Sequence, residues 1–131
     1  MTGTTTNQSH IVTQKEGEVM YTTLCFYLIN RANVLEFIDL QQSISEIMLS
    51  YGALEDHLYE PTTINYGYGC DKLVKLLHMD QNENLFVNQT VYRNRSHYEE
   101  VNKKALQNND IKELNKQRHP FKLLSLSFSS V

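Results

Sequence analysis

The fold is decided by the segment EVMYTTLCFYLI, residues 18–29, and by the segment VLEFIDLQQSISEIMLSY, residues 34–51, that follows it. The first segment is β-prone throughout, and alternate residues of a strand point to opposite faces. One face would carry Val19, Tyr21, Thr23, Cys25, Tyr27 and Ile29, and the other Met20, Thr22, Leu24, Phe26 and Leu28. Both faces are mostly apolar, so both are expected to be covered. A domain of this size covers one face with its own helices, and something else must cover the other.

The second segment repeats apolar residues with the period of a helix. At the helical rotation of about 100° per residue they fall within an arc of about 180°. This arc comprises Val34, Phe37, Ile38, Leu40, Ile44, Ile47, Met48 and Tyr51. The pattern predicts a helix lying on a sheet, with Phe37 and Ile44 at the centre of its inward face. Asn33 and Glu36 have the spacing of a capping box, and Gly52 is placed to end the helix.

The remaining chain predicts three more strands and a second helical region. The strands are expected at residues 53–60, 85–93 and 121–131, with a loop at 61–69 and a short helix at 71–77 between the first two. Ser96 and Glu99 have a second capping-box spacing, the polar residues 108–110 end that helix, and a short helix is expected at 111–117. This order is the βαββαβ pattern of a ferredoxin-like α+β domain, with one antiparallel four-stranded sheet and its helices on one face.

Such a sheet leaves one face bare. We expect this face to carry Tyr, Phe or small polar residues along several strands, and to pack against the same face of a second copy in a symmetric homodimer. Residues 18–131 would form this dimeric α+β barrel domain, and residues 1–17, which contain few apolar groups, are expected to be a flexible leader.

Composition narrows the class of function. The 131 residues carry 12 basic and 15 acidic side chains, a net charge of -3, which argues against a nucleic-acid partner. The N-terminal residues lack the apolar stretch of a signal peptide or membrane span. Two cysteines, Cys25 and Cys70, show no metal or CxxC spacing, so free thiols and a cytoplasmic location are expected.

Four residues on the predicted strands are candidates for a small-molecule site. His57 and Tyr59 lie two apart on one strand, so they share a face that can line the cavity between sheet and helices, where an imidazole beside a phenol could relay a proton. Tyr27 and Tyr92 add phenols that could contact a ligand. The alternative is a structural histidine and tyrosines that serve the core or a dimer contact. The other histidines show no paired spacing, so neither a metal nor another cofactor is indicated.

Several short motifs resemble the dimeric α+β barrel proteins and, among them, the YbaA-like family of unknown function. They are Tyr51-Gly52-Ala53-Leu54 at the end of the first helix, Tyr92 leading into a basic turn at 93–96, the helix at 98–108 with its Asp/Asn-rich end, and Pro120-Phe121 before the last strand. The resemblance spans residues 18–131, and no site residue is transferred through it.

The leading hypothesis is a homodimer whose cavity binds a small apolar or aromatic molecule. The resemblance to the wider superfamily implies, as possible chemistry, cofactor-independent oxidation or isomerisation, with His57 as base and Tyr59 as hydrogen-bond donor. The alternative hypothesis is a non-enzymatic binding or assembly module whose sheet face serves only for dimerisation.

Overall fold

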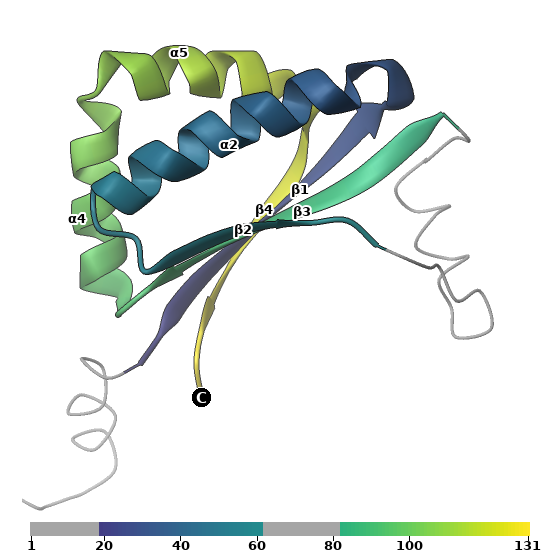
Figure 1. The fold of residues 1–131 in the computed structure, drawn as a ribbon. Helices are drawn as coiled ribbons and strands as arrows, with labels where there is room; N and C mark the ends of the chain where they lie inside the picture. The colour runs from purple at the N-terminus through teal and green to yellow at the C-terminus, as the bar shows by residue number, and fades with distance from the viewer. Residues whose placement is uncertain (1–18, 62–81) are drawn as a thin grey trace, which may run out of the picture.

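The computed structural model describes residues 19–61 and 82–131, and Figure 1 shows a twisted sheet with its helices gathered on one side. The strands are β1 (Tyr21–Asn30), β2 (Glu55–Tyr59), β3 (Glu83–Tyr92) and β4 (Lys122–Ser129). The helices are α2 (Val34–Ser50), α4 (Arg95–Leu106) and α5 (Asn109–Arg118), with 3-10 turns at Arg31–Asn33 and His119–Phe121. The predicted α+β, ferredoxin-like class is confirmed.

The sheet is antiparallel throughout, in the order β2-β3-β1-β4. β1 is central and pairs with β3 from Tyr21↔Tyr92 to Asn30↔Glu83. Its pairing with β4 shifts register between Phe26 and Tyr27. The leader predicted at residues 1–17, the predicted short helix at 71–77 and all but the first residue of the predicted loop at 61–69 lie outside the described residues.

The core forms where α2 packs on the sheet and α5 packs on α2. Phe37 of α2 is 0% exposed, and its ring centroid lies 5.1 Å from that of Tyr27 and 5.4 Å from that of Phe86. Two turns further along α2, Ile44 is 3% exposed and packs in a cluster with Ala105 and other residues of the helical layer. The helix face predicted to point inward is therefore the buried one.

Both capping-box predictions are wrong. Asn33 makes no side-chain cap bond, because it ends a 3-10 turn at φ -107° and ψ 6° rather than adopting the extended conformation of an N-cap. Asn30 caps that turn instead, accepting a hydrogen bond from the Ala32 N–H at 3.0 Å. Helix α4 begins one residue before Ser96, and Asn94, in extended conformation, accepts from the His97 N–H at 2.8 Å. The predicted glycine stop is confirmed, since Gly52 has φ 115°, which favours glycine.

Asn108 begins α5 rather than merely ending α4. Its Oδ1 accepts from the Ile111 N–H at 2.9 Å, and its Nδ2 donates to the Tyr51 hydroxyl at 2.8 Å. We expect Asn108→Ala to lower the free energy of unfolding by about 1–2 kcal/mol, because both the cap and the link to the end of α2 are lost. Urea denaturation measures this loss. Asn109→Ala, at the exposed neighbouring position, is the control and should change stability by less than about 0.5 kcal/mol.

The face of the sheet away from the helices, here called the open sheet face, is more apolar than predicted. Strand alternation and register place on it Met20, Leu24, Phe26, Leu28, Leu85, Val87, Leu124, Leu126 and Phe128. The small polar residues of β4 point the other way, since the Ser125 hydroxyl lies 3.4 Å from the Cys25 thiol on the helix side. The Phe residues expected on this face are present as Phe26 and Phe128, but the small polar residues of β4 lie on the helix side instead.

No helix within residues 19–61 and 82–131 is both long enough and apolar enough to cross a membrane.

Candidate functional site

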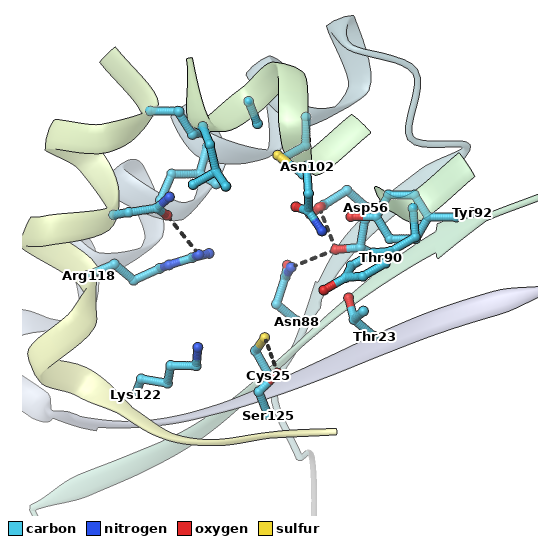
Figure 2. A pocket seen from close by; sticks show the side chains of 17 residues that line it. Thr23, Cys25, Asp56, Asn88, Thr90, Tyr92, Asn102, Arg118, Lys122 and Ser125 are labelled. Atoms are coloured by element: carbon cyan, nitrogen blue, oxygen red, sulfur yellow. Dashed lines mark hydrogen bonds between the residues drawn. The ribbon is translucent and has the colours of Figure 1, made fainter. Parts of the chain in front are cut away.

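A cavity of about 190 Å³ lies between the sheet and the helices, and every helix and strand contributes to its wall (Figure 2). Apolar side chains of the helices form part of the wall, among them Ile44, Met48 and Ile111. The rest is polar and comes mainly from the strands and from α5: Thr23, Asp56, Asn88, Thr90, Asn102, Asn115, Arg118, Lys122 and Ser125. A mixed wall of this kind is typical of a small-molecule site.

Asp56 supplies the acidic end of the cavity. It lies in the middle of β2 and points toward the helices, where Ser45 of α2 donates to its Oδ1 and Thr90 of β3 donates to its Oδ2 at 2.8 Å. The buried amide of Asn88 completes the group. In the amide orientation that satisfies both of its polar atoms, the Asn88 side-chain nitrogen donates at 3.1 Å to Asp56 Oδ1 and to the His57 carbonyl oxygen. Hydrogen bonds thus hold the carboxylate in place without a cationic partner among the described residues.

Arg118 supplies the basic end. It is the last residue of α5, and its guanidinium donates to Gln41 Oε1 at 2.6 Å and to Asn115 Oδ1 at 3.0 Å. The guanidinium carbon lies 5.3 Å from the centre of the Tyr27 ring, a cation–π distance. Lys122, the first residue of β4, lines the cavity on the same side as Arg118 (Figure 2).

Gln41 connects the two ends. This side chain is 1% exposed, accepts from Arg118 and donates through Nε2 to the Ser45 hydroxyl at 3.3 Å, and Ser45 in turn donates to Asp56. A continuous chain of hydrogen bonds therefore runs from the cation to the carboxylate, and its two middle members, Gln41 and Ser45, lie behind the cavity wall. The two charges are held apart by neutral groups rather than paired, so both remain available to a ligand.

The sequence interpretation did not select Asp56, Gln41 or Arg118. One signal was present: Gln41 lies four residues after Phe37 and three before Ile44, so it interrupts the apolar face of the first helix with a polar residue. A buried amide at such a position needs a partner, which here is Arg118. No local pattern marks Arg118 itself.

The two tyrosines predicted to bind a ligand occupy different places. Tyr92 lines the cavity, and burial raises the pKa of its phenol, so the hydroxyl is neutral at physiological pH and can donate a hydrogen bond. Tyr27 is fully buried under Arg118 and is not part of the cavity wall. Burial also raises its pKa, with Arg118 acting in the opposite direction, and its hydroxyl has no hydrogen-bond partner among the described residues.

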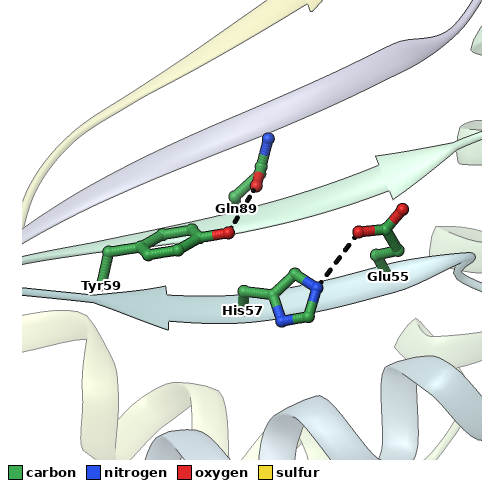
Figure 3. A network of polar contacts seen from close by, with 4 residues as sticks. All are labelled: Glu55, His57, Tyr59 and Gln89. Atoms are coloured by element: carbon green, nitrogen blue, oxygen red, sulfur yellow. Dashed lines mark hydrogen bonds and ion pairs between the residues drawn. The ribbon is translucent and has the colours of Figure 1, made fainter.

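The structure places His57 and Tyr59 on the open sheet face, because their neighbours Asp56 and Leu58 point toward the helices. His57 Nε2 lies 3.1 Å from Glu55 Oε1, and the Tyr59 hydroxyl donates to Gln89 Oε1 at 3.2 Å (Figure 3). The two rings are neighbours, with centroids 6.0 Å apart. They do not line the cavity of about 190 Å³, but they border a separate hollow at the edge of the sheet together with Gln41 and Ser45 of α2. Their catalytic role stays a prediction.

In the described part of the chain, no three His, Cys, Asp or Glu side chains gather closely enough to hold a metal ion.

Comparison with known proteins supports the fold. No family model matches the chain, and neither does any curated protein sequence. SnoaB, a cofactor-independent oxygenase from Streptomyces nogalater, is 10% identical, with a TM-score of 0.54 over 87% of this chain and 92% of SnoaB. A conserved protein from Methanosarcina mazei Go1 is 10% identical, with a TM-score of 0.57 over 88% of this chain and 95% of that protein.

Both structures share the α+β fold of this chain. The finer resemblance to the YbaA-like family is not supported by any family model.

Proposed function

We propose that this protein binds a small, partly apolar molecule in the cavity between its sheet and helices. The observation that carries the proposal is the chain of hydrogen bonds from Arg118 through Gln41 and Ser45 to Asp56, whose two charged ends line the cavity while Gln41 and Ser45 lie outside its wall. Polar side chains are costly to bury, and a core that serves only stability is built from apolar residues. Charged groups held at the rim of an enclosed space instead favour recognition of a ligand.

The size of the cavity limits the ligand to about one ring. Its volume of about 190 Å³ is below the roughly 300–1,000 Å³ of a typical site for a drug-sized molecule. A cavity of roughly 150 Å³ holds benzene. The apolar side chains of α2 and α5 suit such a ring, and the polar groups of the strands suit its substituents.

Catalysis is the second candidate function, and Asp56 is the observation that favours it. A carboxylate inside a partly apolar cavity can accept the proton of an acidic C–H or O–H group, while the electron pair stays on the substrate as an enolate or phenolate. Arg118 would stabilise this anion. Such an anion can be reprotonated at another atom, as in an isomerase, or can react with dioxygen. The similarity to a cofactor-independent oxygenase is compatible with this chemistry.

The proposal includes a homodimer in which the open sheet face of one copy covers that of the other. A cytoplasmic location also belongs to it, and rests on the free thiol of Cys25. The alternative is an assembly module, in which the open sheet face binds a second copy and the cavity binds nothing.

Binding is tested by recording amide NMR spectra while single-ring phenols, ketones and acids are added one at a time. We expect at least one compound to shift the amides of Thr90, Asn102 and Asn115 in a saturable way. Ala105→Leu, which adds a side chain to the cavity wall, should abolish these shifts. Ala32→Leu, which adds the same atoms at an exposed site, should leave them unchanged. A library that shifts no cavity amide would contradict the proposal.

His57→Ala distinguishes this site from the one predicted on β2. Because His57 faces away from the cavity, the variant should bind the same compounds with unchanged affinity. Loss of binding in this variant, with cavity amides that no longer shift, would move the site to the open sheet face.

A further inference from the structure

We infer that the ligand of this cavity is a small carboxylic acid, whose carboxylate binds between Arg118 and Lys122 and whose hydrogen-bond donor faces Asp56. The inference rests on the proposed function and adds the chemical class of the ligand. It is carried by three observations: the unused donors of Arg118, the placement of Lys122, and the opposite character of the two ends of the cavity.

Arg118 is positioned but not neutralised. A guanidinium has five N–H donors, and the two hydrogen bonds to Gln41 and Asn115 leave donors free. Within the described part of the chain it forms no ion pair. Tyr27 below it supplies no negative charge, because burial keeps the pKa of that phenol above its usual value. A partly buried cation of this kind is stabilised by an anion that enters the cavity.

Lys122 is turned toward the cavity by the irregularity in β4. The register with β1 passes from Phe26↔Leu124 directly to Tyr27↔Lys122, so Leu123 is skipped. Lys122 therefore shares the helix side with Tyr27, although Leu124, two residues later, lies on the open sheet face. The bulge adds a second cation at the end of the cavity that holds Arg118 (Figure 2).

The two ends of the cavity select opposite groups. A carboxylate matches the planar donor fork of arginine and gains further from the nearby ammonium group. Asp56, at the other end, only accepts hydrogen bonds when ionised, and would repel a second acid group. A ring with a carboxylate at one end and a hydroxyl at the other satisfies both. The small volume favours a carboxylate over a bulkier phosphate ester.

The test compares 4-hydroxybenzoate with 4-hydroxybenzamide, which has nearly the same shape and no charge, by NMR titration of the full chain. We expect the acid to bind at least 10-fold more tightly than the amide. Phenyl phosphate is the third probe and should bind more weakly than the acid. Equal affinity for acid and amide, or tighter binding of the phosphate, would overturn the inference.

Two variants test whether Arg118 and Lys122 cause the preference for the acid over the amide. Arg118→Gln should remove the preference for the acid. Because this change also breaks the contact with Tyr27, Lys122→Gln at an exposed position is the second variant, and should reduce acid affinity about 3- to 10-fold while leaving amide affinity unchanged. Lys116→Gln removes the same charge from an exposed site on α5 outside the cavity wall, and should leave both affinities unchanged. Equal losses in Lys116→Gln and Lys122→Gln would reduce the effect to general electrostatics and contradict the inference.

The outcomes separate this inference from the proposed function. Neutral ring compounds that bind in the cavity without a preference for the acid would leave the proposed function standing and refute the assignment of a carboxylic acid. Failure of every compound to shift cavity amides would refute both.

Discussion

Phe37→Ala is expected to lower the free energy of unfolding by about 3–5 kcal/mol, a large share of the roughly 5–15 kcal/mol that holds a domain of this size folded. The side chain is fully buried and its ring contacts those of Tyr27, Phe86 and Phe121, with centroid distances of 5.1, 5.4 and 6.1 Å. These partners come from two strands and from the turn before β4. Removal of the ring therefore leaves a cavity at the point where α2 is fixed to the sheet.

Urea denaturation followed by circular dichroism measures this loss. Leu35→Ala is the matched control, because Leu35 lies on the same helix with 79% of its side chain exposed. It should change stability by less than about 0.5 kcal/mol. A loss below about 1 kcal/mol for Phe37→Ala would show that the inward face of α2 is wrongly placed.

Leu126→Glu is expected to convert a homodimer into a monomer. Leu126 and Phe128 of β4 are both 47% exposed on the open sheet face, where they adjoin the apolar residues of β1. A contiguous apolar surface of this kind is typical of an interface, and a second copy can cover it by a twofold arrangement of sheet on sheet. A carboxylate buried at the centre of that contact would have no partner.

Sedimentation equilibrium at micromolar concentration should give about twice 15.3 kDa for the natural sequence and 15.3 kDa for the variant. Ser127→Glu adds the same charge to the same strand but on the helix side, and should leave the dimer intact. A natural chain that sediments as a monomer, or a Leu126→Glu variant that stays dimeric, would contradict the sheet-to-sheet dimer.

The order of strands and helices could be predicted from the sequence because each pattern is local. The period of two in residues 18–29 and the helical period in residues 34–51 depend only on backbone geometry and on which side chains avoid water. Those patterns placed β1 and the buried face of α2 correctly. The residues at which the helices start were harder to predict. Asn33, Asn94 and Ser96 all have side chains that can cap a helix, and only the backbone dihedral angles decide which of them does so.

The site depended on contacts that no local pattern contains. Alternation along β2 shows that His57 and Tyr59 share one face and Asp56 and Leu58 the other, but not which face the helices cover. Packing of α2 decided this, since Ser45 and Gln41 bring hydrogen-bonding groups to the Asp56 side. Arg118 joins them from the end of another helix. The sequence by itself therefore determined the order of strands and helices and the inward face of α2, through local periodicity and the hydrophobic effect. Only the tertiary structure decided which face of the sheet the helices cover and which polar side chains meet, because both depend on how distant segments pack.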